Sequence, residues 1–329
     1  MFRREPNKRT AAFLLVASVC CVASSAQGAD SWPIRPIRLV VTSPPGGAND
    51  TQARVLAAQA SERVGQQIVI DNRGGASGMI AAEIVAKSAP DGYTLLMGTN
   101  STFVVNPYLF PNVPYDTLRD FAPVVMTVTT PHVLLVHPSL PARSVKELIA
   151  LAKSRPGQLN YASSGSGSAF HLGMELLKTV AGIHVVHVPF KGSALSANAM
   201  ISGDVQMMLV GMPTGMPLAK SGRARLLGMA TPVRSALAPD VPTIAESGVP
   251  GYGYQSWFGA AAPAGTPRAV IQRLHDAFAA PLKLPDIRAK LGALGYEVIA
   301  ASSQEMGEKI RVDGKTWAKV IRDSGARAE

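Results

Sequence analysis

The sequence has almost no cysteine and no long apolar segment. Its 329 residues include two cysteines, Cys20 and Cys21, which both lie near the N-terminus. The chain beyond them offers no thiol for a disulfide, a cysteine metal site or a cysteine nucleophile. The longest apolar stretch, residues 11–23, has 13 residues, whereas a helix that crosses a bilayer needs about 20. This stretch is therefore too short to span a membrane.

Charged residues are also scarce. They make up 16% of the chain, against 47% hydrophobic residues, a balance typical of a globular protein rather than a disordered one. The formal net charge of +10 is spread along the chain without a Lys/Arg block or interleaved aromatic residues. We therefore expect no nucleic-acid partner; the charge favours an anionic small ligand, or serves solubility alone.

The N-terminal stretch, residues 1–26, has the pattern of a secretory signal peptide. Four basic residues precede the apolar stretch, and small residues follow it up to Ala26. We predict cleavage after Ala26, or as late as Ala29; a buried first helix is the alternative. Removing four basic residues and Glu5 lowers the formal net charge from +10 by three, to about +7. The remaining chain of roughly 300 residues is long enough for two domains.

Beyond this stretch, one unit occurs twice. Each copy predicts a strand, a glycine-rich loop, a helix, a second strand, a second helix and a third strand, at residues 37–98 and 158–211. The glycine intervals are 19, 9 and 24 residues in the first copy and 17, 10 and 19 in the second. Strands that alternate with helices in this order require parallel pairing with right-handed crossovers. We therefore predict two α/β lobes.

Two segments are predicted to cross between the lobes. Residues 121–136 are rich in valine and break at Thr130-Pro131, and residues 252–262 supply the return crossing. The tail is predicted to be helical, with a capping box at Ser302 and Glu305, and to pack on the first lobe. The predicted fold class is α/β, with each lobe a mostly parallel sheet flanked by helices. Lobe 1 comprises residues 30–128 and 253–329, lobe 2 comprises residues 129–252, and the two crossing strands form the hinge.

The two glycine-rich loops are the predicted ligand site. In open parallel sheets, ligands bind beyond the carboxyl ends of the strands, where N–H groups at helix starts lack partners. A helix dipole contributes about 0.3–1 kcal/mol, whereas micromolar binding needs about 8 kcal/mol. Hydrogen bonds to a charged group, at about 1.5–3 kcal/mol each, must supply the rest, and Thr99, Ser164, Ser166 and Ser168 are available donors. Because neither loop contains lysine or arginine, a carboxylate suits them better than a phosphate.

The sequence gives little support for catalysis or metal binding. A serine hydrolase that uses Ser166 with His171 is an alternative, but Ala162 breaks the Gly-x-Ser-x-Gly pattern. We interpret His171 as a structural or loop-bonding residue. His184 and His187, three residues apart on a predicted strand, would face opposite sides and could not share a metal. We therefore predict no catalytic residue, no metal and no cofactor.

Several motifs resemble one family. They are Pro45-Gly46-Gly47-x-x-Asp50, Asn72-Arg73-Gly74-Gly75-Ala76-x-Gly78, Pro90-Asp91-Gly92-Tyr93-Thr94, Tyr161-x-Ser163-Ser164-Gly165-Ser166-Gly167-Ser168, Val188-Pro189-Phe190-Lys191-Gly192 and Val241-Pro242-Thr243-Ile244. The chain looks like a Bug-type (TctC) periplasmic receptor of the tripartite tricarboxylate transporter system. The resemblance implies a type II periplasmic-binding fold of two lobes. It also implies a monomer that binds a small carboxylate (a di- or tricarboxylate, an amino acid or an aromatic carboxylate) and delivers it to membrane permease subunits. Presentation of the ligand to a sensor kinase is the alternative.

The resemblance also implies a set of binding residues. In the family, the first loop and its counterpart in the second lobe grip the carboxylate, partly through ordered waters. Carried onto this sequence, the ligand-binding residues are Pro45, Gly46, Gly47, Asp50, Ser164, Gly165 and Ser166, with Thr99, Asn100 and Lys191 as neighbours. Because the charge of Asp50 opposes an anion, we assign it to loop organisation or to an amino group of the ligand.

Overall fold

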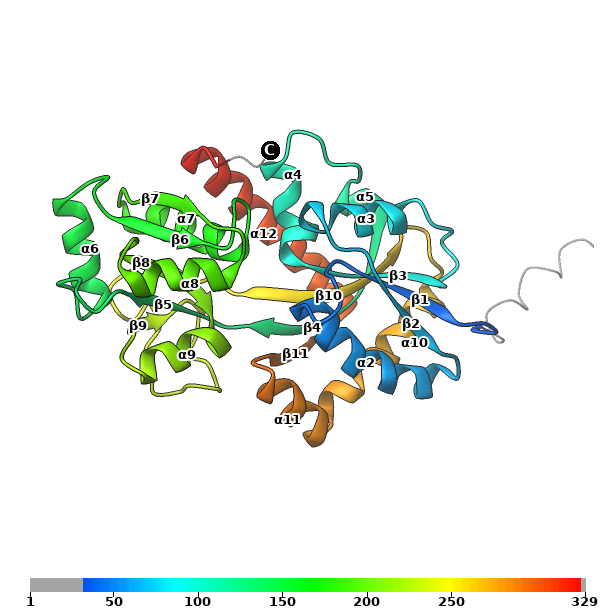
Figure 1. Ribbon diagram of the computed structural model, residues 1–329. Coiled ribbons are helices and arrows are strands. Elements are labelled where there is room, and N and C mark those ends of the chain that lie inside the picture. The colour runs from blue at the N-terminus through cyan, green and yellow to red at the C-terminus, as the bar shows by residue number, and fades with distance from the viewer. Residues whose placement is uncertain (1–31, 327–329) are drawn as a thin grey trace, which may run out of the picture.

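Two sheets, each flanked by helices, form two lobes side by side in the computed structural model, which describes residues 32–326 (Figure 1). The predicted signal peptide lies outside these residues. The six-stranded sheet of lobe 1 has the order β11-β4-β10-β3-β1-β2, and the five-stranded sheet of lobe 2 has the order β7-β6-β8-β5-β9. The two-lobed α/β prediction is confirmed.

The strands of lobe 1 are β1 (Ile37–Val41), β2 (Ile68–Asn72), β3 (Thr94–Thr99), β4 (Phe121–Thr130), β10 (Ser256–Pro263) and β11 (Glu297–Ala301). Those of lobe 2 are β5 (His132–Val136), β6 (Asn160–Ser163), β7 (Val186–Pro189), β8 (Met207–Gly211) and β9 (Arg225–Met229). The α-helices are α2 (Ala48–Val64), α3 (Met79–Ala86), α4 (Asn106–Leu109), α5 (Thr117–Asp120), α6 (Val145–Ser154), α7 (Ala169–Ala181), α8 (Ser193–Ser202), α9 (Met212–Lys220), α10 (Arg268–Ala279), α11 (Pro285–Ala293) and α12 (Ser303–Ser324). Short turns of other helix types lie at η1 (Ala76–Gly78), η2 (Ser101–Val105) and η3 (Pro281–Lys283).

Among the named strands of residues 32–326, parallel pairing is confined to the repeated unit. β1 pairs in parallel with β2 and β3, and β6 pairs in parallel with β7 and β8. The crossing strands add antiparallel pairs, β10 with β3 and β4 in lobe 1 and β5 with β8 and β9 in lobe 2. β11, which lies within the tail expected to be helical, adds another antiparallel pair with β4. Each sheet is therefore mixed, with the predicted parallel part inside it.

Local signals set the helix ends. Gly65 and Gly182, in the left-handed conformation at φ 77° and 60°, end α2 and α7 where the sequence predicts. Ser302 and Glu305 form the predicted capping box at the start of α12. Ser144 caps α6 by accepting a hydrogen bond from the Glu147 N–H at 3.2 Å. None of the helices described in residues 32–326 has the length and apolarity of a membrane span.

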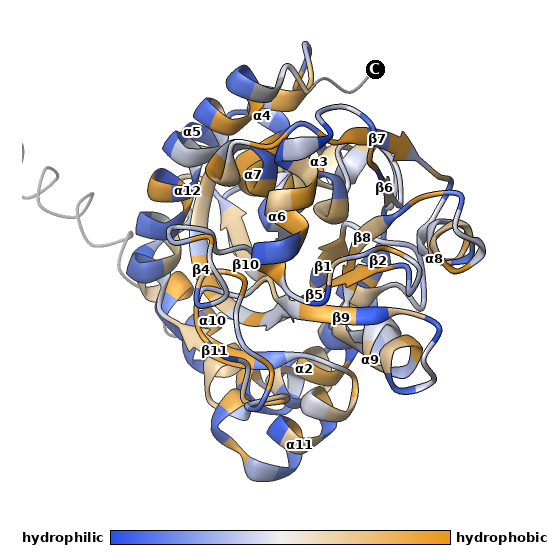
Figure 2. Ribbon diagram, turned by 90° about the vertical axis from the view of Figure 1, so that its left-hand side faces the viewer, coloured by the Kyte–Doolittle hydropathy of each residue, from blue (hydrophilic) through white to orange (hydrophobic). Residues whose placement is uncertain are grey.

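The last helix joins the two lobes. α12 packs on β4 of lobe 1 and also on α7 of lobe 2, and the Trp317 ring meets the Tyr254 ring edge-on at 5.4 Å. The predicted inner face of α12 is buried, at Met306, Ile310 and Trp317. The hydropathy colours fit this packing, because the strands are largely hydrophobic while the helices carry both kinds of residue (Figure 2). The prediction that the tail packs on lobe 1 is thus incomplete, since the helix also contacts lobe 2.

Candidate functional site

A cleft of about 370 Å³ opens between the lobes, a volume typical of a small-molecule site. Strand ends, helix starts and the crossing strands of both lobes contribute to its walls. The lining residues are Thr42, Ser43, Ala48, Asn49, Gly75, Ser77, Gly78, Thr99, Asn100, Ser101, Thr130, His132, Gly167, Ser168, Ala169, Phe170, Gly211, Ser256 and Phe258.

The start of α2 forms one end of the cleft. Ala48 and Asn49 are its first two residues, and both line the cleft. The third amide, of Asp50, donates to Ser43 Oγ at 3.0 Å. The first two amides have no acceptor in a preceding turn of the helix. Two N–H groups at the positive end of a helix therefore lie at the cleft wall.

The start of α7 repeats this arrangement in lobe 2. Ala169 and Phe170 are its first two residues and line the cleft. The third amide, of His171, donates to Ser168 Oγ at 3.3 Å. In both copies of the repeated unit, a serine hydroxyl thus satisfies the third amide, and the first two amides stay at the cleft wall. The paired amides suit an anion, as helix N-termini do generally.

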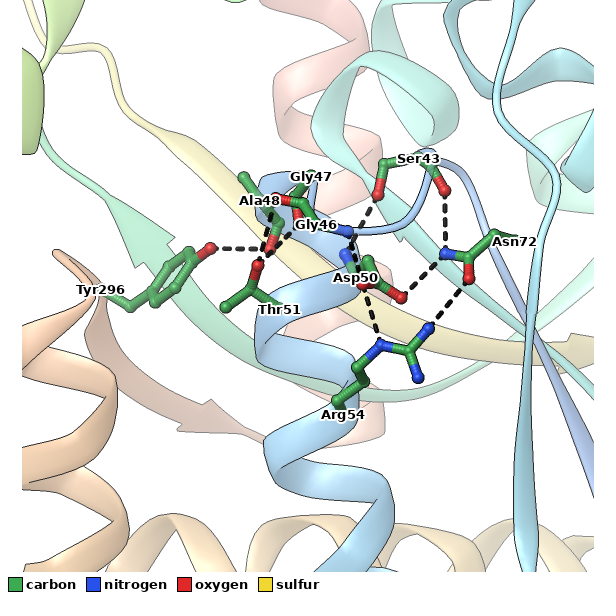
Figure 3. Close-up of polar contacts among 9 residues, drawn as sticks. All are labelled: Ser43, Gly46, Gly47, Ala48, Asp50, Thr51, Arg54, Asn72 and Tyr296. Atoms are coloured by element: carbon green, nitrogen blue, oxygen red, sulfur yellow. Dashed lines mark hydrogen bonds and ion pairs between the residues drawn. The ribbon is translucent and has the colours of Figure 1, made fainter.

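Asp50 holds the first glycine-rich loop in place through hydrogen bonds made outside the cleft (Figure 3). Its carboxylate accepts hydrogen bonds from the Gly46 N–H at 2.8 Å, Arg54 Nε at 2.9 Å and Asn72 Nδ2 at 2.8 Å. Burial alone would raise the pKa of Asp50, but these donors outweigh it and hold the pKa below its usual value. The side chain is 2% exposed and does not line the cleft. This geometry supports loop organisation over contact with a ligand amino group.

Two stacked histidines, His171 buried and His187 half-buried, hold the second loop. The Gly167 N–H donates to His171 Nδ1 at 3.0 Å, and the His171 ring stacks on His187 with 4.0 Å between centroids. His187 Nε2 lies 2.6 Å from Ser163 Oγ, which accepts from the Gly165 N–H at 3.1 Å. Burial lowers the pKa of each histidine to about 4, so both rings are neutral at pH 7. His171 is therefore the loop-bonding residue that the sequence predicts.

Two of the ten predicted binding residues, Thr99 and Asn100, line the cleft. The other eight lie beside it or behind it: Pro45, Gly46, Gly47, Asp50, Ser164, Gly165, Ser166 and Lys191. The amides of Gly46, Gly47 and Gly165 already donate within their loops, to Asp50, Pro44 and Ser163. The predicted loops do reach the cleft, but their contribution comes from the residues at the helix starts.

Sequence reasoning missed one wall of the cleft. Thr130, His132 and Ser256, from β4, β5 and β10, line it where the chain crosses between the lobes; we call these three residues the hinge wall. The break at Thr130-Pro131 marked the crossing, and its polar neighbours were the available signal. Burial lowers the pKa of His132 to about 4, so this ring too is neutral at pH 7.

Among the described residues that line the cleft there is no charged side chain, since none of them is a lysine, arginine, aspartate or glutamate. Its positive potential therefore comes from helix N-termini, including that of α9, whose N-cap Gly211 lines it. Within residues 32–326, no group of three or more histidines, cysteines, aspartates or glutamates is placed to hold a metal. His171 Nδ1 accepts a hydrogen bond from the Gly167 N–H at 3.0 Å, and Ser166 does not line the cleft.

Two α/β lobes joined by crossing strands, with paired helix N-termini in the cleft between them, define a two-lobed solute-binding protein. The chain belongs to the TctC family: residues 52–326 match the family model described as "Tripartite tricarboxylate transporter family receptor". Proteins of this family are substrate-binding receptors, which confirms the prediction that the chain is not an enzyme.

Individual relatives agree with this assignment. Protein BugT of Bordetella pertussis is 36% identical over 91% of this chain and 92% of its own length. The structure titled "R. palustris Rpa4515 with adipate" is 40% identical, with a TM-score of 0.77 over 90% of this chain and 99% of that one. The structure of MatC from Rhodopseudomonas palustris with bound malate is 31% identical, with a TM-score of 0.73 over 88% of this chain and 100% of that one. The predicted Bug/TctC resemblance is confirmed.

Proposed function

We propose that this protein is a periplasmic receptor that captures a small carboxylate in the interlobe cleft and delivers it to the permease of a tripartite tricarboxylate transporter. The observation that carries the proposal is the pair of equivalent helix starts, Ala48–Asn49 and Ala169–Phe170, whose amides lie at the wall of a cleft without charged side chains. Such amides bind an oxyanion through hydrogen bonds and helix dipoles together.

The relatives support a carboxylate as ligand. Two structures that match this chain over most of its length hold adipate and malate, which are both dicarboxylates. The family description names a transporter, which favours a permease over a sensor kinase as the partner. The signal-peptide pattern of residues 1–26 supports a periplasmic location.

Thermal unfolding of the chain without residues 1–26 tests the capture of a carboxylate. Adipate and malate are compared with adipamide, which keeps the chain of adipate but carries no charge. A carboxylate present at 100 times its Kd should stabilise the protein by about 2.7 kcal/mol and raise Tm by several degrees. The proposal is wrong if no carboxylate in a broad panel shifts Tm.

Proline at the first helical position tests the helix starts directly. The substitutions Ala48→Pro and Ala169→Pro each remove one amide donor. The preceding residues Gly47 and Ser168 have extended backbones, at φ −70° and ψ 162° and at φ −66° and ψ 159°, which suit a following proline. Each lost donor to a carboxylate should weaken binding about 10- to 100-fold.

A matched control separates this effect from damage to a helix. Arg268 is the first residue of α10, exposed and outside the cleft. Arg268→Pro should therefore leave carboxylate affinity unchanged. Equal affinities in all three proline variants and in the unmodified protein would contradict the assignment of the amides.

A further inference from the structure

The hinge wall contains polar atoms without partners. His132 is 2% exposed, and among the described residues nothing bonds its Nδ1. Thr130 Oγ1 is likewise buried and unpaired. The remaining nitrogen of the imidazole, Nε2, has a long contact of 3.4 Å with Ser256 Oγ. An unsatisfied buried donor or acceptor costs about 1–3 kcal/mol, so a ligand group that pairs with these atoms gains a corresponding advantage.

Strand pairing sets these side chains around one space. Thr130 and Ser256 are directly opposite each other in the β4–β10 pair, which puts their side chains on the same face of the sheet. His132 is opposite Gly211 in the β5–β8 pair, so no side chain stands across from the imidazole. A Cβ on Gly211 would have one contact, with Pro213 Cδ at an ordinary 3.8 Å. The cleft thus has room beside His132.

The potential at the hinge wall favours a negative group. Gly211, across from His132, is also the N-cap of α9, so the positive end of a nine-residue helix lies there. The lining of the cleft contains no carboxylate that would repel an anion. The hydroxyl groups and the neutral imidazole of the hinge wall can all donate hydrogen bonds to an anion.

Two aromatic side chains add apolar surface to the cleft. Phe170 and Phe258 both line it, and the Phe170 ring contacts the His132 ring edge-on at 5.2 Å. A ligand with an apolar middle and a polar group at each end matches a cleft that combines these rings with the polar hinge wall and the helix starts.

We propose that the hinge wall is a second anion subsite, which takes the far carboxylate of a dicarboxylate with an aliphatic or aromatic middle, and that His132 determines the preference for this second group. The inference rests on the proposed function, because the first carboxylate must be held by the helix starts.

Isothermal titration with matched ligands tests the subsite. Succinate, glutarate, adipate and pimelate are each compared with the monocarboxylate of the same chain length. The unmodified protein should bind the best-fitting dicarboxylate at least tenfold more tightly than its monocarboxylate partner.

Two substitutions examine the wall itself. His132→Phe keeps a ring of similar size against Phe170 and removes both nitrogens, and Thr130→Val keeps the shape and removes the hydroxyl. Each should weaken the dicarboxylate about tenfold or more while changing the monocarboxylate less than threefold, so that the ratio of affinities collapses. Thr130→Val keeps the test valid if His132→Phe fails to fold. His137→Asn, beyond the other end of β5 and outside the cleft, is the control and should leave the ratio unchanged.

The outcomes are distinguishable. A monocarboxylate that binds as tightly as its dicarboxylate, or a variant in which both ligands weaken equally, overturns the second subsite and leaves the receptor function intact. If neither kind of carboxylate binds the unmodified protein, the proposed function and this inference both fail.

Discussion

Replacing Asp50 by alanine removes the acceptor around which the first loop is built. Three donors converge on this carboxylate, from Gly46, Arg54 and Asn72. Hydrogen bonds to a charged group contribute about 1.5–3 kcal/mol each. The side chain of Arg54 is 54% exposed and Gly46 is also exposed. When the carboxylate is removed, water can therefore accept hydrogen bonds from these two donors in its place. We therefore expect Asp50→Ala to lower the free energy of unfolding by about 2–4 kcal/mol.

Urea unfolding measures this loss, and titration with the best carboxylate measures its effect on the site. The freed loop leads directly into α2, so the amides of Ala48 and Asn49 lose their fixed positions. We expect at least a tenfold loss of affinity. Asp50→Asn keeps one acceptor oxygen but places an NH₂ group against the donors from Gly46, Arg54 and Asn72. It should therefore restore only part of the stability and part of the carboxylate affinity.

Glu83→Ala is the control, because Glu83 forms an exposed helix pair with Lys87 and such pairs contribute about 0.3–0.5 kcal/mol. An Asp50→Ala variant as stable as Glu83→Ala, with unchanged carboxylate affinity, would refute the assignment of Asp50 to loop organisation. A loss of affinity confined to ligands with an amino group would instead favour direct contact.

Two further predictions concern the three histidines whose pKa is lowered by burial. The pKa values of His132, His171 and His187 are lowered by burial from 6.5 to about 4, so the unfolded chain binds more protons than the folded one between these values. The free energy of unfolding should therefore fall as pH decreases from about 6.5 to 4, by up to about 3 kcal/mol for one such ring. Urea titrations across this range should show the fall, and a flat profile would contradict it. Separately, His171→Leu leaves the Gly167 N–H without its acceptor and should weaken carboxylate binding about tenfold, whereas His171→Asn places an oxygen near the position of Nδ1 and should recover much of the affinity. Equal affinities for the two variants in the same titration would mean that His171 does not position the loop.

Much of the fold followed from the repeated unit. Glycine-rich loops at matched places predicted parallel strands in both lobes, and Thr130-Pro131 marked the first crossing. β11 was not predicted, because it pairs only with the distant strand β4 and its short sequence has no strong pattern. The contact of α12 with α7 depends on how the lobes meet, which the periodicity of a single helix does not reveal.

The sequence predicted which loops reach the site, but not which residues of those loops line it. Which amides remain available depends on hydrogen bonds inside each turn, such as that from Gly46 to Asp50, and spacing does not show them. The hinge wall brings Thr130 and Ser256, which are 126 positions apart in the sequence (256 − 130), together through the pairing of β4 with β10. Long-range register of this kind has no local sequence signal.

The contact of α12 with both lobes bears on how the molecule comes apart. One continuous apolar cluster includes Val40 and Phe103 from lobe 1, Leu134 and Tyr161 from lobe 2, and Trp317 from α12. Separating the two lobes would expose this shared interior on both of them. Because this interior is shared, we expect the two lobes to unfold together rather than as separate folding units.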